Sequence, residues 1–294
     1  MTRCAGLLPL VWLAEGVARL PQRLLLGLSR CLVVLFWPLL ASRRRIAAIN
    51  IALCFPELDA PAQRGLLHAN LVETVMGMFD QLRAWYAPDA ALRHSLRIEG
   101  VEHLLAARAA GQGVLLLTGH LIQAELASRL LALGTGLPIR GVVRRHNSPC
   151  LEAEYERARQ RVFEPTLAKK DVRGLMRSLQ SGALVVYSAD QDFSYQHAFV
   201  PFFGVPAATL VGTEKMVRHA GARMHPFWFH RAADGQYQVR IGASWPGWLE
   251  GEPAPSAAIY MRELEQVVRE HPEQYLWVHR RFKTRPPGDP PIYR

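Results

Sequence analysis

The stretch GVLLLTGHLIQAELASRLLALG (residues 113–134) contains two apolar segments separated by a short turn. The first, Val114–Leu117, has the length of a buried strand, and the second, Ile122–Leu133, has the length of a helix. A strand that leads through a turn into a helix is the repeating unit of α/β proteins. His120 lies in the turn, at the carboxyl end of the predicted strand, where parallel sheets bind their ligands.

The same alternation continues along the chain on both sides of this stretch. Further β-like runs lie at Leu96–Ile98, Ile139–Val143, Ala183–Ser188, His225–His230 and Gln236–Ile241. Helical runs lie between most of them, at Val101–Ala110, Cys150–Arg161, Asp171–Gln180 and Gly212–Ala220. A longer helix is predicted to begin after Asp59, a favourable N-cap residue, and to run to Trp85. The alternation predicts an α/β fold with a mostly parallel central sheet.

The first 45 residues are richer in apolar side chains than the rest. Leu24–Ala41 is almost entirely apolar, and three arginines follow it at 43–45. These 18 residues would span about 27 Å as a helix, close to the thickness of a bilayer core. We therefore expect residues 1–45 to form an apolar, membrane-associated helical segment and residues 46–294 to form the α/β domain.

The charges in this segment indicate how it would meet a membrane. Arg30, near its middle, favours a shallow interfacial position over a full span. The arginines at 43–45 favour a cytoplasmic location for the domain that follows. A signal peptide and a buried core helix are the alternatives, and Trp37, Pro38 and the arginines fit a signal-peptide cleavage site poorly.

The chain carries a formal net charge of +10 and has a pI of about 9.9, which indicates an anionic partner. Nucleic acid is not expected, because the sequence has no zinc-finger spacing, RNP-like aromatic motif or basic zipper. The four cysteines include no CxxC pair, so neither a metal nor another cofactor is predicted. The charge therefore favours a phosphate-rich lipid or an acidic protein as partner.

His120 and Glu125 form a candidate pair of base and carboxylate. Within one helix, residues five apart point about 140° away from each other. If His120 precedes the helix, Glu125 can hold one imidazole nitrogen while the other accepts a proton. A capping histidine and an exposed first-turn glutamate are the alternative interpretation. No GxSxG motif accompanies the pair, so the substrate is expected to supply the attacking hydroxyl.

Five blocks of sequence together resemble the late acyltransferases of lipid A biosynthesis, the lauroyl/myristoyl transferase family. They are RIAAINIALCFPEL, GVEHLLAARAAGQGVLLLTGH, VVRRHNSP, SADQDFSYQHAFVPFFGVPAATLVG and HPEQYLWVHRRFKTRP. The resemblance implies a glycerolipid-acyltransferase-like core at the cytoplasmic side of the bacterial inner membrane. It also implies that residues 46–294 are an acyltransferase domain. That domain would move a fatty acyl chain from acyl carrier protein to a hydroxyl of a lipid A precursor.

The resemblance also implies roles for particular residues. The family's H(x)4(D/E) motif corresponds to His120 as general base and Glu125 as the residue that orients it. The arginine of a block usually read as YRPxxNP corresponds to Arg144, although Val143 and Arg145 here replace the tyrosine and the proline. Arg144 and Arg145 are the expected ligands of acceptor phosphates, because a guanidinium can hold two phosphate oxygens. The alternative for each is a solvated surface charge.

Two later blocks add further candidates. The family's aspartate-rich turn corresponds to Asp190 and Asp192, which are expected to contact substrate. Phe202 and Phe203 belong either to the wall of an acyl-chain groove or to the core. The closing block is expected to contain a last strand at Trp277–Val278. Its cations are expected to form a rim that meets anionic lipid or an acidic carrier protein; they are Arg280, Arg281, Lys283 and Arg285.

Three other functions are alternatives to this interpretation. An acyltransferase for a lysophospholipid or ornithine-lipid type of acceptor would keep His120 and change only the acceptor. A thioester hydrolase would use water in place of the lipid hydroxyl. A catalytically silent membrane-binding protein would have no need of both His120 and Glu125, so the intact pair argues against it.

Overall fold

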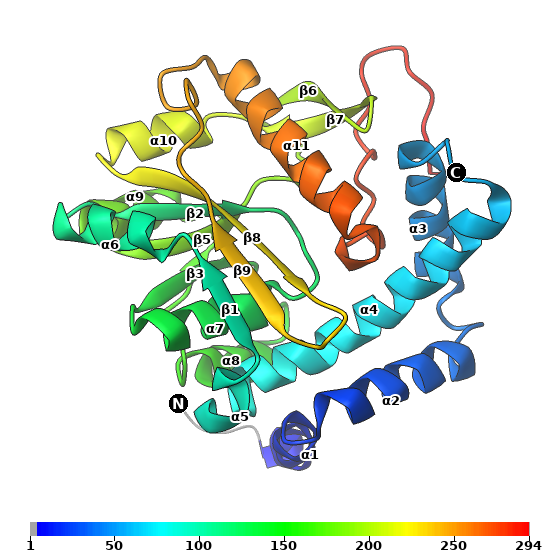
Figure 1. The fold of residues 1–294 in the computed structure, drawn as a ribbon. Helices are drawn as coiled ribbons and strands as arrows, with labels where there is room; N and C mark the ends of the chain where they lie inside the picture. The colour runs from blue at the N-terminus through cyan, green and yellow to red at the C-terminus, as the bar shows by residue number, and fades with distance from the viewer. Residues whose placement is uncertain (1–4, 294) are drawn as a thin grey trace.

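A computed structural model describes residues 5–293 and shows a central sheet flanked by helices (Figure 1). The described part contains a seven-stranded sheet in the order β1-β9-β8-β2-β5-β3-β4. The strands are β1 Leu96–Glu99, β2 Val114–Thr118, β3 Ile139–Val143, β4 Leu167–Ala168, β5 Leu184–Ser188, β8 Arg223–Arg231 and β9 Tyr237–Ile241. Neighbouring strands are parallel except for β8 and β9. The predicted α/β fold with a mostly parallel sheet is confirmed.

The centre of the sheet is β2, which lies between β8 and β5. All five of its side chains are buried, as expected for a strand covered on both faces. The helices that follow the strands are α6 Val101–Ala109, α7 Ala124–Thr135, α8 Pro149–Arg159, α9 Val172–Gln180 and α10 Thr213–His219. α7 packs against β1, β3 and β9, whereas α9 packs against β5 and α10 against β8. The turn that contains His120 therefore leaves the sheet at its middle.

A hairpin and a long helix in the C-terminal half were not predicted from the sequence. The FFG block forms an antiparallel hairpin of β6 His197–Phe202 and β7 Val205–Leu210. Its turn residues, Phe203 and Gly204, have φ of +53° and +73°, a region that glycine tolerates and phenylalanine seldom adopts. The helix α11 Pro253–Glu270 packs along β6.

The long helix α4, Ala60–Tyr86, begins where the sequence indicated. The Asp59 carboxylate accepts a hydrogen bond from the Ala62 N–H at 2.8 Å, which caps the helix. α4 contacts α7 and the short helix η2, Pro272–Gln274. It also contacts three N-terminal helices, which are α1 Leu8–Ala18, α2 Gln22–Leu35 and α3 Ala41–Cys54. It therefore connects the N-terminal helices to the sheet. The remaining short elements are η1 Ala5–Leu7 and α5 Asp89–Arg93.

The apolar run at 24–41 is not one continuous helix. Its first part lies in α2, Gln22–Leu35, and the chain then turns over residues 36–40 before α3, Ala41–Cys54, begins. Pro38 lies in that turn, and its ring and missing N–H disfavour a continuous helix. Within residues 5–293, no helix combines the length and apolar character needed to cross a membrane. A full span by this run is not borne out, and residues 1–4 lie outside the described part.

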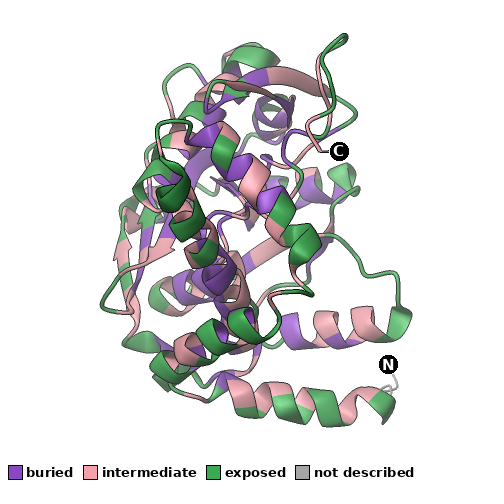
Figure 2. Cartoon of the chain, turned by 90° about the vertical axis from the view of Figure 1, so that its right-hand side faces the viewer, coloured by how far each residue is buried: buried purple, intermediate pink, exposed green. Residues whose placement is uncertain are grey.

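The N-terminal helices lie at one edge of the molecule, and many of their residues are exposed or half-buried (Figure 2). α1, Leu8–Ala18, and α2 both pack on α4 and leave much of their surface uncovered. The exposed large apolar residues of this region are Leu10, Trp12, Leu13, Leu24, Leu28, Val34, Leu35, Phe36 and Leu39. A group of this kind is typical of an interaction surface.

Candidate active site

His120 and Asp190 meet because their strands are neighbours in the sheet. Thr118, the last residue of β2, pairs with Ser188, the last residue of β5, in parallel register. His120 and Asp190 each lie two positions beyond that pair, so both turns leave the same edge of the sheet.

The Asp190 carboxylate is buried and accepts three hydrogen bonds. His120 donates its backbone N–H to Oδ2 at 2.9 Å and its Nδ1–H to Oδ1 at 2.6 Å, and the Tyr275 hydroxyl donates to Oδ2 at 2.8 Å. Burial alone would raise the pKa of Asp190, but the charge and hydrogen bonds of His120 hold that pKa well below its ordinary value. An ionised carboxylate only accepts, so Nδ1 carries the proton and Nε2 is left to accept one.

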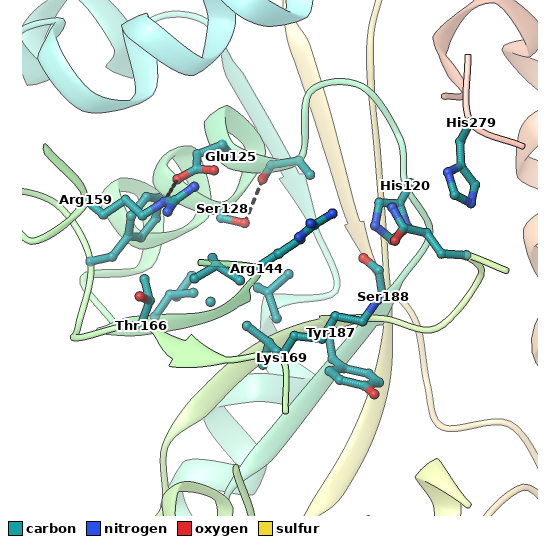
Figure 3. A pocket seen from close by; sticks show the side chains of 18 of the residues that line it. His120, Glu125, Ser128, Arg144, Arg159, Thr166, Lys169, Tyr187, Ser188 and His279 are labelled. Atoms are coloured by element: carbon teal, nitrogen blue, oxygen red, sulfur yellow. Dashed lines mark hydrogen bonds and ion pairs between the residues drawn. The ribbon is translucent and has the colours of Figure 1, made fainter. Parts of the chain in front are cut away.

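The carboxylate that orients His120 is therefore Asp190, and the expectation that Glu125 does so is corrected. Oε1 of Glu125 accepts hydrogen bonds from Trp85 Nε1 and Arg159 Nε, both at 2.8 Å. Because α7 begins only at Ala124, Glu125 lies in its first turn and is directed toward α4 and α8 rather than toward the imidazole. Figure 3 shows Glu125 with Arg159, well apart from His120.

A cavity of about 490 Å³ opens beside His120 (Figure 3). Arg144, Arg159 and Lys169 line it, and Arg144 extends toward His120. Burial, and after it the charge of Arg144, lower the pKa of Lys169. Like charges held close together repel each other, and an anion bound between them offsets this repulsion. The cavity is thus suited to a phosphate-bearing ligand.

Arg145 lies outside the cavity lining, unlike its neighbour Arg144. Its Nη1 is 3.1 Å from Glu152 Oε1 in an ion pair whose arginine is half exposed. Of the two predicted phosphate ligands, the structure brings only Arg144 to His120.

Phe202 and Phe203 belong to the core. Their side chains are 0% and 7% exposed, and their rings pack against Trp277. Of the two interpretations left open by the sequence, groove wall or core, the structure shows the core.

Asp192 holds the C-terminal segment in place. Its carboxylate accepts hydrogen bonds from the Thr284 N–H at 2.8 Å and the Thr284 hydroxyl at 2.9 Å. Within residues 5–293, Asp190 likewise bonds only to His120 and Tyr275, so both aspartates bind protein groups rather than line the cavity.

The closing WVHRRFKTRP block is more buried than expected. Trp277 and Val278 lie in a turn and not in a strand. Arg281 is 1% exposed, and its guanidinium donates to the Ala208 carbonyl at 2.8 Å and to the Thr209 hydroxyl at 2.6 Å. The prediction that Arg281 belongs to a solvent-exposed rim is therefore wrong, because hairpin acceptors remote in sequence draw it inside.

The same C-terminal segment fixes the turn at His120. The Leu276 N–H donates to the His120 carbonyl at 3.1 Å, and the Ile122 N–H donates to the Gln274 carbonyl at 2.9 Å. Together with the Tyr275 hydroxyl, these bonds hold the imidazole and its carboxylate as one unit.

His279 is a second imidazole at the cavity, next to His120 (Figure 3). Its Nε2 accepts the backbone N–H of Asp192 at 3.4 Å. Burial, and after it the charge of His120, lower the pKa of His279 to about 4. His279 is therefore neutral at neutral pH.

Sequence reasoning missed four residues of this site. Tyr275 and His279 lie in a block that pointed to the family but gave no role to either. Arg159 and Lys169 lie outside the motifs, and only the fold brings them to the cavity. Among residues 5–293, no three His, Cys, Asp or Glu side chains are grouped to hold a metal ion.

The chain is similar to known acyltransferases along nearly its whole length. A family model for bacterial lipid A biosynthesis acyltransferases matches residues 4–284. The lipid A biosynthesis lauroyltransferase of Escherichia coli (strain K12) is 33% identical over 298 residues, covering 97% of this chain and 94% of that protein. The palmitoleoyltransferase of the same strain is 32% identical over 292 residues with the same coverage. Its lipid A biosynthesis myristoyltransferase is 26% identical over 262 residues, covering 86% and 79%.

Proposed function

This chain belongs to the bacterial lipid A biosynthesis acyltransferase family, and from that premise we propose that it moves a fatty acyl chain from acyl carrier protein to a hydroxyl of a lipid A precursor. Membership makes it an O-acyltransferase of lipid A biosynthesis. The observation that carries the proposed chemistry is His120, held through Nδ1–H by a buried carboxylate at the edge of a cationic cavity.

His120 acts as the general base through Nε2. It takes the proton of the acceptor hydroxyl while that oxygen attacks the thioester carbonyl carbon and a C–O bond forms. The C–S bond then breaks, and the leaving thiolate takes the same proton from the imidazolium. General acid–base catalysis of this kind contributes about 10²–10⁴ in rate. Asp190 fixes the tautomer and stabilises the imidazolium that forms between the two transfers.

The cationic wall positions the acceptor. Arg144 offers a planar fork that can hold two phosphate oxygens, and Lys169 adds a point charge beside it. Glu125 acts on binding through Arg159, because it fixes that guanidinium by Nε and leaves the two Nη nitrogens for a ligand. The acceptor phosphate is thus held where its neighbouring hydroxyl can reach His120.

We place the protein at the cytoplasmic face of the bacterial inner membrane. The exposed apolar side chains of α1 and α2 support a shallow interfacial position, with Arg30 exposed among them. Each arginine or lysine near anionic headgroups adds about 1 kcal/mol to such binding. Flotation with anionic vesicles tests this, and we expect removal of residues 1–41 to weaken the binding in part and to leave it more sensitive to salt.

An acyl-transfer assay tests the proposed reaction. Purified protein is incubated with acyl–acyl carrier protein and a lipid A precursor, and mass spectrometry measures a gain of one acyl group in the acceptor. Release of free fatty acid with an unmodified acceptor would favour hydrolysis. Transfer to a lysophospholipid or ornithine lipid, but not to the lipid A precursor, would favour the alternative acceptor class.

A further inference from the structure

A second cavity also reaches His120. It has a volume of about 320 Å³ and shares His120, Ala124, Glu125 and Ser188 with the first. Its other wall is provided by residues of α4 between 74 and 81. A transfer between two substrates requires both to reach the base at once, and the two cavities offer two separate approaches.

The two cavities differ in charge. Three cationic side chains line the first, whereas none of the described residues that line the second is a lysine or arginine. The ionisable groups of the second are the carboxyl of Asp80 and the shared Glu125 and His120. A phosphate in the second cavity would have no lysine or arginine to pair with and would lie next to carboxyl groups.

Two residues that line the second cavity each carry a buried polar atom without a partner in the described part of the chain. Asp80 and Gln123 are each 1% exposed. Asp80 Oδ1 accepts from the Tyr237 hydroxyl at 2.6 Å and from Arg83 Nη1 at 3.1 Å, whereas Oδ2 bonds to nothing among the described residues. Gln123 Nε2 donates to Gln274 at 2.9 Å, but Gln123 Oε1 has no partner in the described part of the chain. Buried polar atoms are costly unless paired, so a hydrogen-bonding ligand is favoured over hydrocarbon.

We propose that this second cavity receives the amide-bearing thioester arm of the acyl donor, a pantetheine-type group, while the cationic cavity receives the phosphorylated acceptor. The inference rests on the proposed acyl transfer, and it assigns each of the two substrates to one cavity. Amide N–H groups of such an arm can donate to Gln123 Oε1 and Asp80 Oδ2, and the arm is uncharged next to its thioester. The thioester carbonyl then reaches His120 from the α4 side, and the hydroxyl reaches it from the cationic side.

The protonation state of Asp80 does not alter this match. Burial raises the pKa of Asp80, and the charge of Arg83 opposes that rise. In either protonation state, Asp80 Oδ2 keeps a lone pair that can accept from an amide N–H, which the NH₂ group of an asparagine lacks. An amide supplies that N–H donor, whereas a hydrocarbon chain does not.

The test is steady-state kinetics with acyl-pantetheine as donor and a phosphorylated lipid A precursor as acceptor, each varied while the other is saturating. Asp80→Asn keeps an oxygen for Arg83 and Tyr237 but places an NH₂ group where the unpaired oxygen lies. We expect the KM for acyl-pantetheine to rise about tenfold, as for one lost hydrogen bond, and the KM for acceptor to stay unchanged. Asp234→Asn, the same substitution on an exposed turn outside both cavities, should change neither KM.

A second variant guards against a folding defect in the first. Gln81→Phe narrows the cavity from a half-buried position on α4, and we expect a similar rise in the donor KM; circular dichroism checks that each variant is folded. A raised acceptor KM with an unchanged donor KM, or no change in either KM for folded variants, overturns the inference. Failure of the wild-type protein to acylate any phosphorylated acceptor would instead contradict the proposed function.

Discussion

Two groups of residues surround His120, here called the floor and the wall, and they differ in burial and in charge balance. The floor consists of Asp190, Tyr275 and the C-terminal segment that carries Tyr275. Asp190 and Tyr275 are buried, and the Asp190 carboxylate accepts three hydrogen bonds. The wall, formed by Arg144 and Lys169, is exposed and holds two like charges close together. The fold therefore sets the position of the base, whereas an anionic substrate completes the charge balance of the wall.

Removal of the base from the floor should have the largest effect. We expect His120→Ala to lower kcat by about 10²–10⁴, the usual range for loss of a general base. Acyl transfer from acyl–acyl carrier protein to a lipid A precursor measures it, with circular dichroism as the folding control. A folded variant with near-normal kcat would remove His120 from the mechanism.

A change in the wall should act on acceptor binding instead. We expect Arg144→Ala to raise the KM for acceptor by about 10–100-fold, as for a lost charged hydrogen bond, and Arg144→Lys to have a smaller effect because only the fork is lost. Arg145→Ala, next in sequence but outside the cavity, is the matched control and should have little effect. Equal effects of the two alanine substitutions would mean that the cavity does not bind the phosphate.

Loss of one hydrogen bond in the floor should have a smaller effect. We expect Tyr275→Phe, which removes a donor from Asp190 Oδ2, to lower kcat by about 2–10-fold and to leave both KM values unchanged. Tyr195→Phe removes the hydroxyl of an exposed tyrosine and serves as control. If Tyr275→Phe changed only a KM, Tyr275 would belong to substrate binding and not to the floor.

The neutral His279 should give the smallest effect, on stability. Its pKa is about 4 in the folded protein against an ordinary value of 6.5, so the unfolded chain binds the additional proton between these pH values. The free energy of unfolding should therefore fall as pH is lowered from 6.5 toward 4. Urea denaturation at pH 7 and pH 5 measures this fall, and we expect it to be smaller in His279→Gln. An identical fall in the variant would show that His279 does not contribute to it.

The sequence predicts the strands and the position of the base better than it predicts the partner of the base. Apolar runs mark buried strands directly, and a residue just after such a run lies at a strand end. The partner depends on which strands are neighbours, and β2 and β5 are adjacent only in the folded sheet. Spacing therefore drew attention to Glu125, five residues away, when Asp190, 70 residues away, makes the contact.

The two ends of the chain show the same limit. An apolar composition predicts a membrane-seeking N-terminus, but Pro38 lies in the turn at residues 36–40, where the apolar run leaves α2 before α3 begins. A cluster of arginines predicts an exposed rim, but Arg281 is buried because Ala208, 73 residues away, supplies its acceptor. The local sequence pattern predicts helices and strands, whereas contacts between residues far apart in the sequence decide which side chains are buried.

Comparison of kcat and KM in Asp190→Asn and Glu125→Gln decides which carboxylate orients His120. If Asp190 orients and stabilises the imidazole, Asp190→Asn should lower kcat and leave the KM for acceptor unchanged, because the developing imidazolium loses its negative partner. Glu125→Gln should raise the KM for acceptor and leave kcat near that of the wild type, because Glu125 holds Arg159. A clear loss of kcat in Glu125→Gln with near-normal kcat in folded Asp190→Asn would contradict the assignment.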